Sequence, residues 1–193
     1  MGLVYGVGYN SENKPCYIAG KPLVQYTLWT NMLRRCYCDD YLIEKPSYKN
    51  CLASEKFKDY SYFYEWCQKQ IGFNDKGFQL DKDLLIKNNK LYGEDTCVFI
   101  PKEINMSLIM RKSARGKYPI GVSFDKKTDA FRARYSDNGV CKLIGYFDNQ
   151  FDAFDFYKLK KEEYIKYMAE KYKDKIDIKA YRALINYTVE ITD

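Results

Sequence analysis

The sequence predicts an α+β protein. A largely helical N-terminal region with a strand–strand–helix (ββα) unit precedes a three-stranded antiparallel sheet packed on one helix. Three patterns support this class: helical spacing of apolar residues near the N-terminus, turn-bounded strand candidates after residue 117, and one long amphipathic segment after them. A polar, basic stretch at 111–117 separates the two regions, so we place the domains at 1–112 and 113–193.

The N-terminal elements follow from periodicity and turn residues. Apolar residues recur at helical spacing over Val24–Tyr37 and again over Ser54–Ile71, which predicts two amphipathic helices. Short strand candidates then lie at Phe78–Asp83 and Cys97–Ile100, with a polar turn between them. Pro101 suits the first turn of a helix, so this region has the order strand, loop, strand, helix.

The C-terminal region is predicted to form a sheet with two different faces. Turn residues separate three strand candidates, which a long amphipathic helix and a short closing helix follow: Ile120–Phe124, Phe131–Tyr135, Lys142–Phe147, Gln150–Tyr172, and a segment within Asp174–Asp193. Alternation puts Phe131, Ala133 and Tyr135 on one face of the second strand. Arg132 and Arg134 fall on the other face, so one face is expected to pack and the other to be basic.

Composition narrows the classes of protein. The 193 residues are 30% charged and 46% hydrophobic, as in ordinary soluble proteins, and no apolar run is long enough to cross a bilayer. The N-terminus lacks a secretory signal, so we expect a cytoplasmic protein without a membrane partner. The chain has no histidine, which removes the commonest general base near neutral pH. The net charge of +6 suits a nucleic-acid ligand.

Seven cysteines make an odd number, which disfavours a disulfide framework in a cytoplasmic chain. Cys36 and Cys38, with Cys51 and Cys67, would supply four thiolates for zinc. The paired C-x-x-C spacing of zinc knuckles is missing, however. We therefore expect reduced, mostly buried thiols rather than a zinc site.

Basic residues gather at the start of the C-terminal region, where seven Lys and Arg face three Asp between Ser113 and Phe147. Four segments there, in this order, resemble the APETALA/ethylene-response-factor-type DNA-binding domain: Tyr118–Val122, Phe131–Arg134, Ile144–Phe147 and Phe151–Tyr157. That family lays its three-stranded sheet in the major groove of DNA. A family tryptophan appears here as Phe131, and a family arginine as Ser123.

This resemblance implies DNA-contact roles for strand arginines and neighbouring lysines. Arg132 and Arg134 would contact bases and phosphates, and Lys126, Lys127 and Lys142 would add phosphate contacts. The alternative is that the arginines form only the solvated face of a half-open sheet.

The N-terminal region resembles phage HNH homing-endonuclease relatives over roughly Tyr26 to Leu108. The residues that carry the likeness are Trp29, Met32, Arg35, Cys36, Tyr48, Cys51, Trp66, Leu80–Asp83, Tyr92, Cys97–Pro101 and Ile104–Asn105. In that family a ββα (His-Me) finger holds one divalent metal, such as Mg²⁺, while a histidine activates water.

The resemblance assigns a role to each matching position. Asp81 and Asn105 would bind the metal, and Lys82 stands where the catalytic histidine would be. Apart from the resemblance, Asp83 would assist Lys82 in a working variant of this site. Thr96 replaces a structural asparagine. A lysine is normally protonated, so Lys82 is expected to contact phosphate first and to act as a base second. The alternative is that these acids only shape a polar turn.

Three functions remain open from the sequence. The first is a phage or mobile-element DNA-binding protein of the HNH type with weakened or lost cleavage, acting on double-stranded DNA in a bacterial cytoplasm. The second is an active Mg²⁺-dependent nicking endonuclease. The third is a repurposed scaffold that binds and inhibits a host defence protein or ribonucleoprotein. The absent histidine and the 20 tyrosines motivate it, because Tyr and Arg are favoured at interface hot spots.

Overall fold

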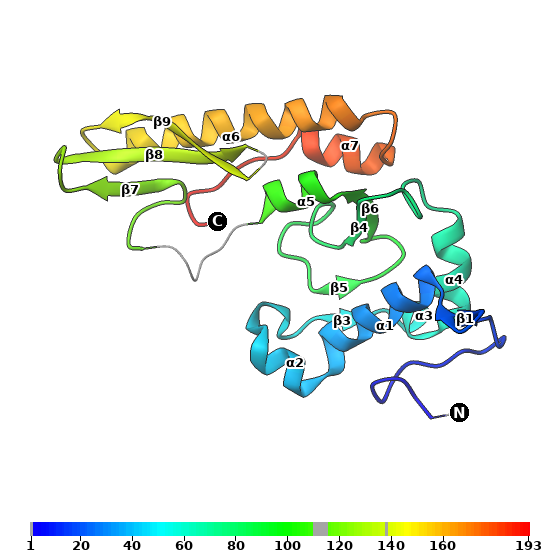
Figure 1. The fold of residues 1–193 in the computed structure, drawn as a ribbon. Helices are drawn as coiled ribbons and strands as arrows, with labels where there is room; N and C mark the ends of the chain where they lie inside the picture. Colours follow the sequence, from blue (N-terminus) through cyan, green and yellow to red (C-terminus); the bar gives the residue numbers. More distant parts are fainter. Residues whose placement is uncertain (1, 110–115, 138) are drawn as a thin grey trace. The chain divides into compact units, whose positions relative to one another are not determined.

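The computed structural model describes residues 2–109, 116–137 and 139–193 (Figure 1). Contacts divide the chain into two compact units. The first contains Met1–Ile100 and Lys175–Ala180, and the second contains Pro101–Asp174 and Tyr181–Asp193. The predicted boundary between residues 112 and 113 lies outside the described residues.

The first unit combines helices with short strand pairs. Its elements are β1 (Tyr17–Ile18), β2 (Lys21–Pro22), α1 (Val24–Tyr37), α2 (Asp39–Glu44), the 3-10 helix η1 (Pro46–Tyr48), β3 (Leu52–Ala53), α3 (Glu55–Lys58), α4 (Tyr60–Gln68), β4 (Phe78–Asp81), β5 (Leu91–Tyr92) and β6 (Val98–Pro101). β1 pairs with β2 antiparallel, β3 with β5 parallel, and β4 with β6. The bounds of α1 are those predicted from its apolar spacing.

Aromatic side chains build the core of the first unit. Trp29 of α1 is fully buried, and its indole Nε1 donates a hydrogen bond to the backbone oxygen of Phe57 at 2.8 Å. The ring of Phe57 packs edge-on against Phe63 and Trp66 of α4. Such rings bury large areas, so they fix the helices of this unit against one another.

The single helix predicted over Ser54–Ile71 is wrong, because the chain breaks it at Asp59 into α3 and α4. Asp59 has extended backbone angles, and its carboxylate caps α4 by accepting a hydrogen bond from the N–H of Ser61. Tyr9 bridges the break, since its N–H donates to Lys58 and its carbonyl accepts from Tyr60. The distant N-terminal segment therefore completes hydrogen bonds that a continuous helix would make internally.

The second unit holds the sheet and the long helix. Its elements are α5 (Lys102–Leu108), β7 (Val122–Asp125), β8 (Ala130–Asp137), β9 (Val140–Phe147), α6 (Gln150–Tyr172) and the later part of α7 (Ile178–Ile185). The strands form an antiparallel sheet in the order β7-β8-β9. The α+β class and the three-stranded antiparallel sheet are therefore confirmed.

Helix α6 covers the predicted apolar face of this sheet. Its bounds match the prediction, and Asn149 caps it by accepting hydrogen bonds from two backbone N–H groups. Phe154 and Tyr157 of α6 form one buried cluster with Ala133, and Phe131 packs at its margin. Alternation along β8 thus assigned its packed face correctly.

The predicted ββα unit stays a prediction. β4 pairs with β6 and α5 follows directly in the chain, but α5 belongs to the second unit. None of the described helices combines the length and hydrophobicity that crossing a bilayer requires.

Candidate nucleic-acid interface

The sheet face opposite α6 carries both predicted arginines. Directly opposed residues of antiparallel strands point to the same side, and the register opposes Arg132 to Ser123 on β7 and to Tyr146 on β9. Arg134 opposes Leu143. We call these five residues the arginine face. Arg134, Leu143 and Tyr146 are exposed, so this face offers cationic, aromatic and apolar groups to solvent.

The two arginines are held differently. Arg132 is half-buried, and its Nη1 lies 3.3 Å from Oδ2 of Asp125. Its buried Nε and the Oγ of Ser123 opposite have no hydrogen-bond partner within the described part of the chain. Arg134 is exposed, while its backbone N–H donates to the carbonyl of Gly121 at 2.9 Å. Arg132 is therefore oriented by an acid, and Arg134 projects from a fixed backbone.

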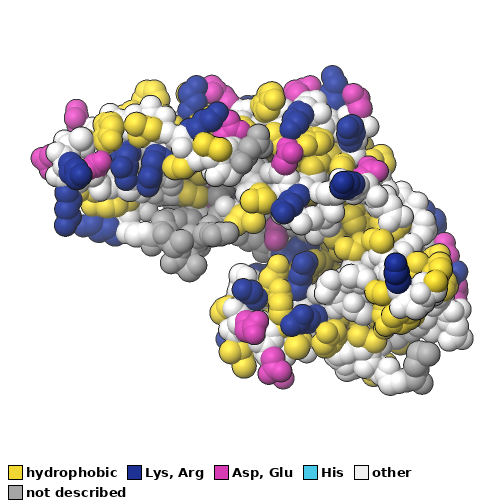
Figure 2. All heavy atoms as spheres, in the orientation of Figure 1, with side chains coloured by type: hydrophobic (Ala, Val, Ile, Leu, Met, Phe, Trp, Pro, Cys, Tyr) yellow, Lys and Arg dark blue, Asp and Glu magenta, His cyan; other side chains and the backbone are white. Residues whose placement is uncertain are grey.

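The turn between β7 and β8 adds two lysines to this end of the sheet. Lys126 and Lys127 are exposed, and the backbone N–H of Lys127 donates to Oδ1 of Asp125 at 3.0 Å. Figure 2 shows Lys and Arg side chains gathered over this end, where Figure 1 draws the β7–β8 turn. Four predicted contact residues thus lie on the arginine face or its adjoining turn.

Lys142, the fifth predicted contact, lies on the other face. It opposes Tyr135 in the register, and Tyr135 packs beside α6. Its Nζ forms an ion pair with Asp137, which raises the pKa of the lysine. The cause is a bulge: Ala133 opposes Gly145 while Arg134 opposes Leu143, so Ile144 is an extra residue on β9. An extra residue reverses the alternation, which spacing alone did not reveal.

The acidic pair predicted as a catalytic site forms a self-contained turn after β4. Oδ1 of Asp81 accepts hydrogen bonds from the backbone N–H of Asp83 at 3.0 Å and of Leu84 at 2.7 Å. Lys82 is only 5% exposed, and its Nζ lies 2.6 Å from Oδ1 of Asp83 and 2.7 Å from the carbonyl of Asn89. The amino group expected to meet phosphate is thus bonded within its own turn.

This turn suits a divalent cation poorly. Burial raises the pKa of Asp81 above its usual range, and one oxygen of Asp81 and one of Asp83 already have internal partners. Asn105, the other predicted ligand, lies on α5 in the second unit. Across residues 2–109, 116–137 and 139–193, no three Asp, Glu, Cys or His side chains are grouped to hold a metal ion.

The cysteines are free thiols. Of the four weighed as zinc ligands, Cys36, Cys51 and Cys67 are buried and Cys38 is partly exposed. Burial, reinforced by Cys51, raises the pKa of Cys36 to about 12. In the metal-free protein such a thiol stays protonated near neutral pH, and it would have to release its proton to bind zinc.

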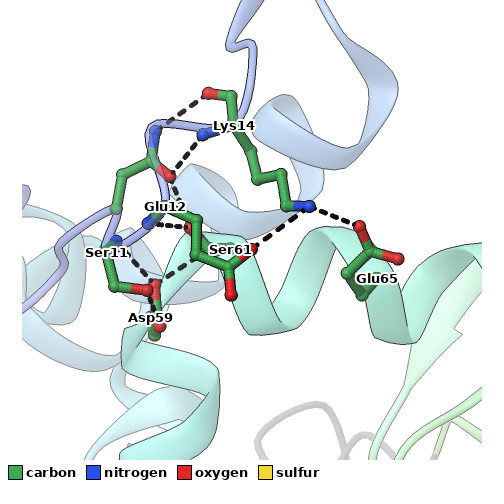
Figure 3. Close-up of polar contacts among 7 residues, drawn as sticks. Ser11, Glu12, Lys14, Asp59, Ser61 and Glu65 are labelled. Carbon is green, nitrogen blue, oxygen red and sulfur yellow. Dashed lines mark hydrogen bonds and ion pairs between the residues drawn. The ribbon is translucent and has the colours of Figure 1, made fainter.

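A cavity that the sequence did not predict lies beside the start of α4. It has a volume of about 280 Å³ and is lined by Glu12, Asp59, Ser61, Tyr62, Glu65, Trp66 and Lys69. Its carboxylates are engaged, as Figure 3 shows: Ser11 donates two hydrogen bonds to Asp59, and Lys14 lies 2.7 Å from Glu65. These contacts tie the N-terminal segment to α4, so we interpret the cluster as structural.

Asp59→Ala is expected to lower the free energy of unfolding by about 1–2 kcal/mol, because it removes the cap of α4 and the acceptor for Ser11. Chemical denaturation followed by tryptophan fluorescence measures this change. Asp59→Asn is the matched control, since its side-chain oxygen still accepts from the Ser61 N–H. Equal losses in the two variants would contradict the capping role.

Comparison with protein-family models, curated protein sequences and solved structures found no match. Function is therefore inferred from the residues of the chain itself. The arginine face is the stronger candidate site, because its charged and aromatic groups are exposed. In the Asp81 turn, Lys82 is buried, the Asp81 carboxylate accepts hydrogen bonds from its own turn, and the exposed Asp83 is paired with Lys82.

Proposed function

We propose that this chain is a DNA-binding protein of a phage or mobile element, and that the arginine face contacts double-stranded DNA. One observation carries the proposal. Helix α6 packs against one face of the β7–β8–β9 sheet. On the opposite face, Arg134 and Tyr146 are exposed to solvent beside Arg132.

The geometry suits a DNA groove. Neighbouring strands lie about 4.8 Å apart, and the major groove, about 12 Å wide, admits a two-stranded ribbon. A guanidinium binds a phosphate or a guanine edge through two parallel hydrogen bonds. Arg134 has the exposure for such a contact, and Lys126 and Lys127 on the adjoining turn supply phosphate contacts.

The proposal covers binding and contains no cleavage step. Lys82 and Asp83 pair with each other, and Asp81 holds its own turn, so neither a free base nor a ready set of metal ligands is presented. Incubation with supercoiled plasmid and Mg²⁺ tests the endonuclease alternative. Nicking by the wild type that Asp81→Ala abolishes would favour that alternative.

Arg134→Ala is expected to weaken binding to a DNA duplex roughly 5- to 100-fold, the usual cost of losing one arginine contact. If Arg134 contacts phosphate, the slope of log affinity against log salt also falls by about one. Fluorescence anisotropy over a salt series measures both quantities.

Lys142→Ala is the matched control, because it removes one exposed positive charge from the opposite face of the same sheet. We expect it to change affinity little. Equal losses in the two variants, or an affinity that does not depend on salt, would contradict the assigned face. If neither variant loses affinity, the partner to seek is a host protein or ribonucleoprotein, by capture from nuclease-treated lysate.

A further inference from the structure

We propose that Leu143 selects thymine in the bound duplex, by contacting the C5-methyl group of that base in the major groove, beside the position that Arg134 contacts. The inference rests on the proposed function and deepens it, because it names a residue that reads sequence. Contacts to phosphate orient a protein on DNA, whereas sequence is read through contacts to base edges. A residue of the arginine face that selects sequence must therefore meet a base.

A bulge in β9 puts Leu143 on the arginine face. Strict alternation from Tyr146 would instead put Ile144 and Lys142 on that face. Ile144 is the extra residue of the bulge and packs against the buried cluster between the sheet and α6, so Leu143 takes the position opposite Arg134. Bulges beside functional sites commonly re-aim a side chain. This bulge gives the face a leucine where regular pairing would give it a lysine.

Leu143 is accessible to a ligand and close to a cation. Its side chain is 53% exposed, and the side chain of Arg134 directly opposite is exposed as well. Directly opposed side chains have Cβ atoms about 4.5–5.5 Å apart. Successive phosphates of one DNA strand are about 3.4 Å apart along the helix axis. The arginine and the leucine therefore reach neighbouring positions on one duplex.

The ribbon formed by β8 and β9 is the part of the sheet that suits a groove. Each of these strands has eight residues, whereas β7 has four. On the arginine face β7 carries Ser123 and, two residues later, Asp125, whose carboxylate pairs with Arg132. Figure 2 shows hydrophobic side chains among Lys and Arg side chains over the region where Figure 1 draws β8 and β9.

The chemistry of leucine identifies its ligand. An aliphatic side chain offers no hydrogen bond to a phosphate or to the polar atoms of a base. Thymine, however, presents its C5-methyl group in the major groove. Contact between the leucine and this methyl group withdraws apolar surface from water, so it adds affinity only where a thymine is present.

Replacement of thymine by deoxyuridine tests the proposal, because uracil pairs as thymine does and lacks only the C5-methyl group. Binding sites are first selected from a randomised duplex library, and each thymine of the selected site is then replaced singly. For the wild type, replacement of one thymine is expected to weaken binding roughly 4-fold, the effect of returning one methyl group to water. Fluorescence anisotropy measures both affinities.

Leu143→Ser should bind the thymine and deoxyuridine duplexes equally, and Leu143→Met, which keeps an apolar side chain of similar length, should retain the preference. Val140→Ser is the matched control, because Val140 is an exposed aliphatic residue of the same strand that opposes Asp137 on the other face. It should keep the roughly 4-fold ratio. An effect of uracil on the stiffness of the duplex is common to all four proteins, so it does not follow the side chain.

Salt-dependent binding by a wild type for which no thymine methyl group matters overturns the inference and leaves DNA binding in place. A methyl effect that persists in Leu143→Ser, or that disappears in Val140→Ser, overturns it too. If the wild type shows no salt-dependent binding to any duplex, the proposed function fails, and the inference fails with it.

Discussion

Replacing Gly121 with alanine is expected to lower the free energy of unfolding of the second unit by about 2–5 kcal/mol. Gly121 has a φ of +77°, a left-handed conformation that costs an L-residue about 1–2 kcal/mol. A Cβ there would lie 2.1 Å from Cδ2 of Tyr157, whose ring is buried in the core between the sheet and α6. Overpacking of this kind adds roughly 1–3 kcal/mol or more.

Gly139→Ala separates the cost of backbone strain from the cost of overpacking against Tyr157. Gly139 has a similar φ of +81°, but no heavy atom lies within 4 Å of a Cβ at that position. We expect it to cost only the backbone strain, about 1–2 kcal/mol. Denaturation followed by circular dichroism compares the two variants. Equal losses would show that the contact with Tyr157 contributes nothing.

Gly121→Ala should also weaken DNA binding by the protein molecules that stay folded. The carbonyl of Gly121 accepts the hydrogen bond from the N–H of Arg134, so displacement of Gly121 moves the exposed arginine of the proposed interface. Gly139→Ala supplies the matched reference for affinity as well.

Replacing Lys161 with methionine is expected to stabilise the protein by up to about 3 kcal/mol near neutral pH. Lys161 lies on the packed side of α6 and is only 5% exposed. Burial lowers the pKa of its amino group from 10.5 to about 8. Below pH 8 the folded protein therefore keeps a buried charge, and this penalty corresponds to about 1.4 kcal/mol for each unit of pKa. Methionine has a similar unbranched shape and no charge.

The pH dependence gives a sharper test of Lys161. Between pH 8 and 10.5 the folded amine is neutral while the unfolded amine is still protonated, so unfolding takes up a proton and stability rises with pH. The advantage of Lys161→Met should therefore be largest below pH 8, shrink through this window, and end above it. Lys166→Met, at an exposed position of the same helix, is the control. A difference from wild type that does not change with pH would contradict the buried-charge account.

Much of the fold could be predicted because its signals are local. α1 and α6 have the predicted bounds, since their apolar spacing marks them in the sequence. The packed face of β8 followed from simple alternation. The break at Asp59 and the parallel pair β3–β5 were missed, because both depend on segments far apart in the chain: Tyr9 bridges the first, and Lys90 and Tyr92 accept the hydrogen bonds of the second.

The residues of the candidate sites also fall into two groups: those that the sequence placed and those that only the structure placed. The sequence by itself determined that Arg132 and Arg134 share one face of a strand and that Lys126 and Lys127 occupy a turn beside it. Only the tertiary structure decided that Lys142 lies on the opposite face, because a bulge reverses the alternation. It also decided that the buried Lys82 pairs with the exposed Asp83, because a buried amine is more stable beside a carboxylate than alone. The spacing of residue types in the sequence determines which side chains share a face of a helix or strand. Strand register and burial determine which of those side chains are exposed to solvent.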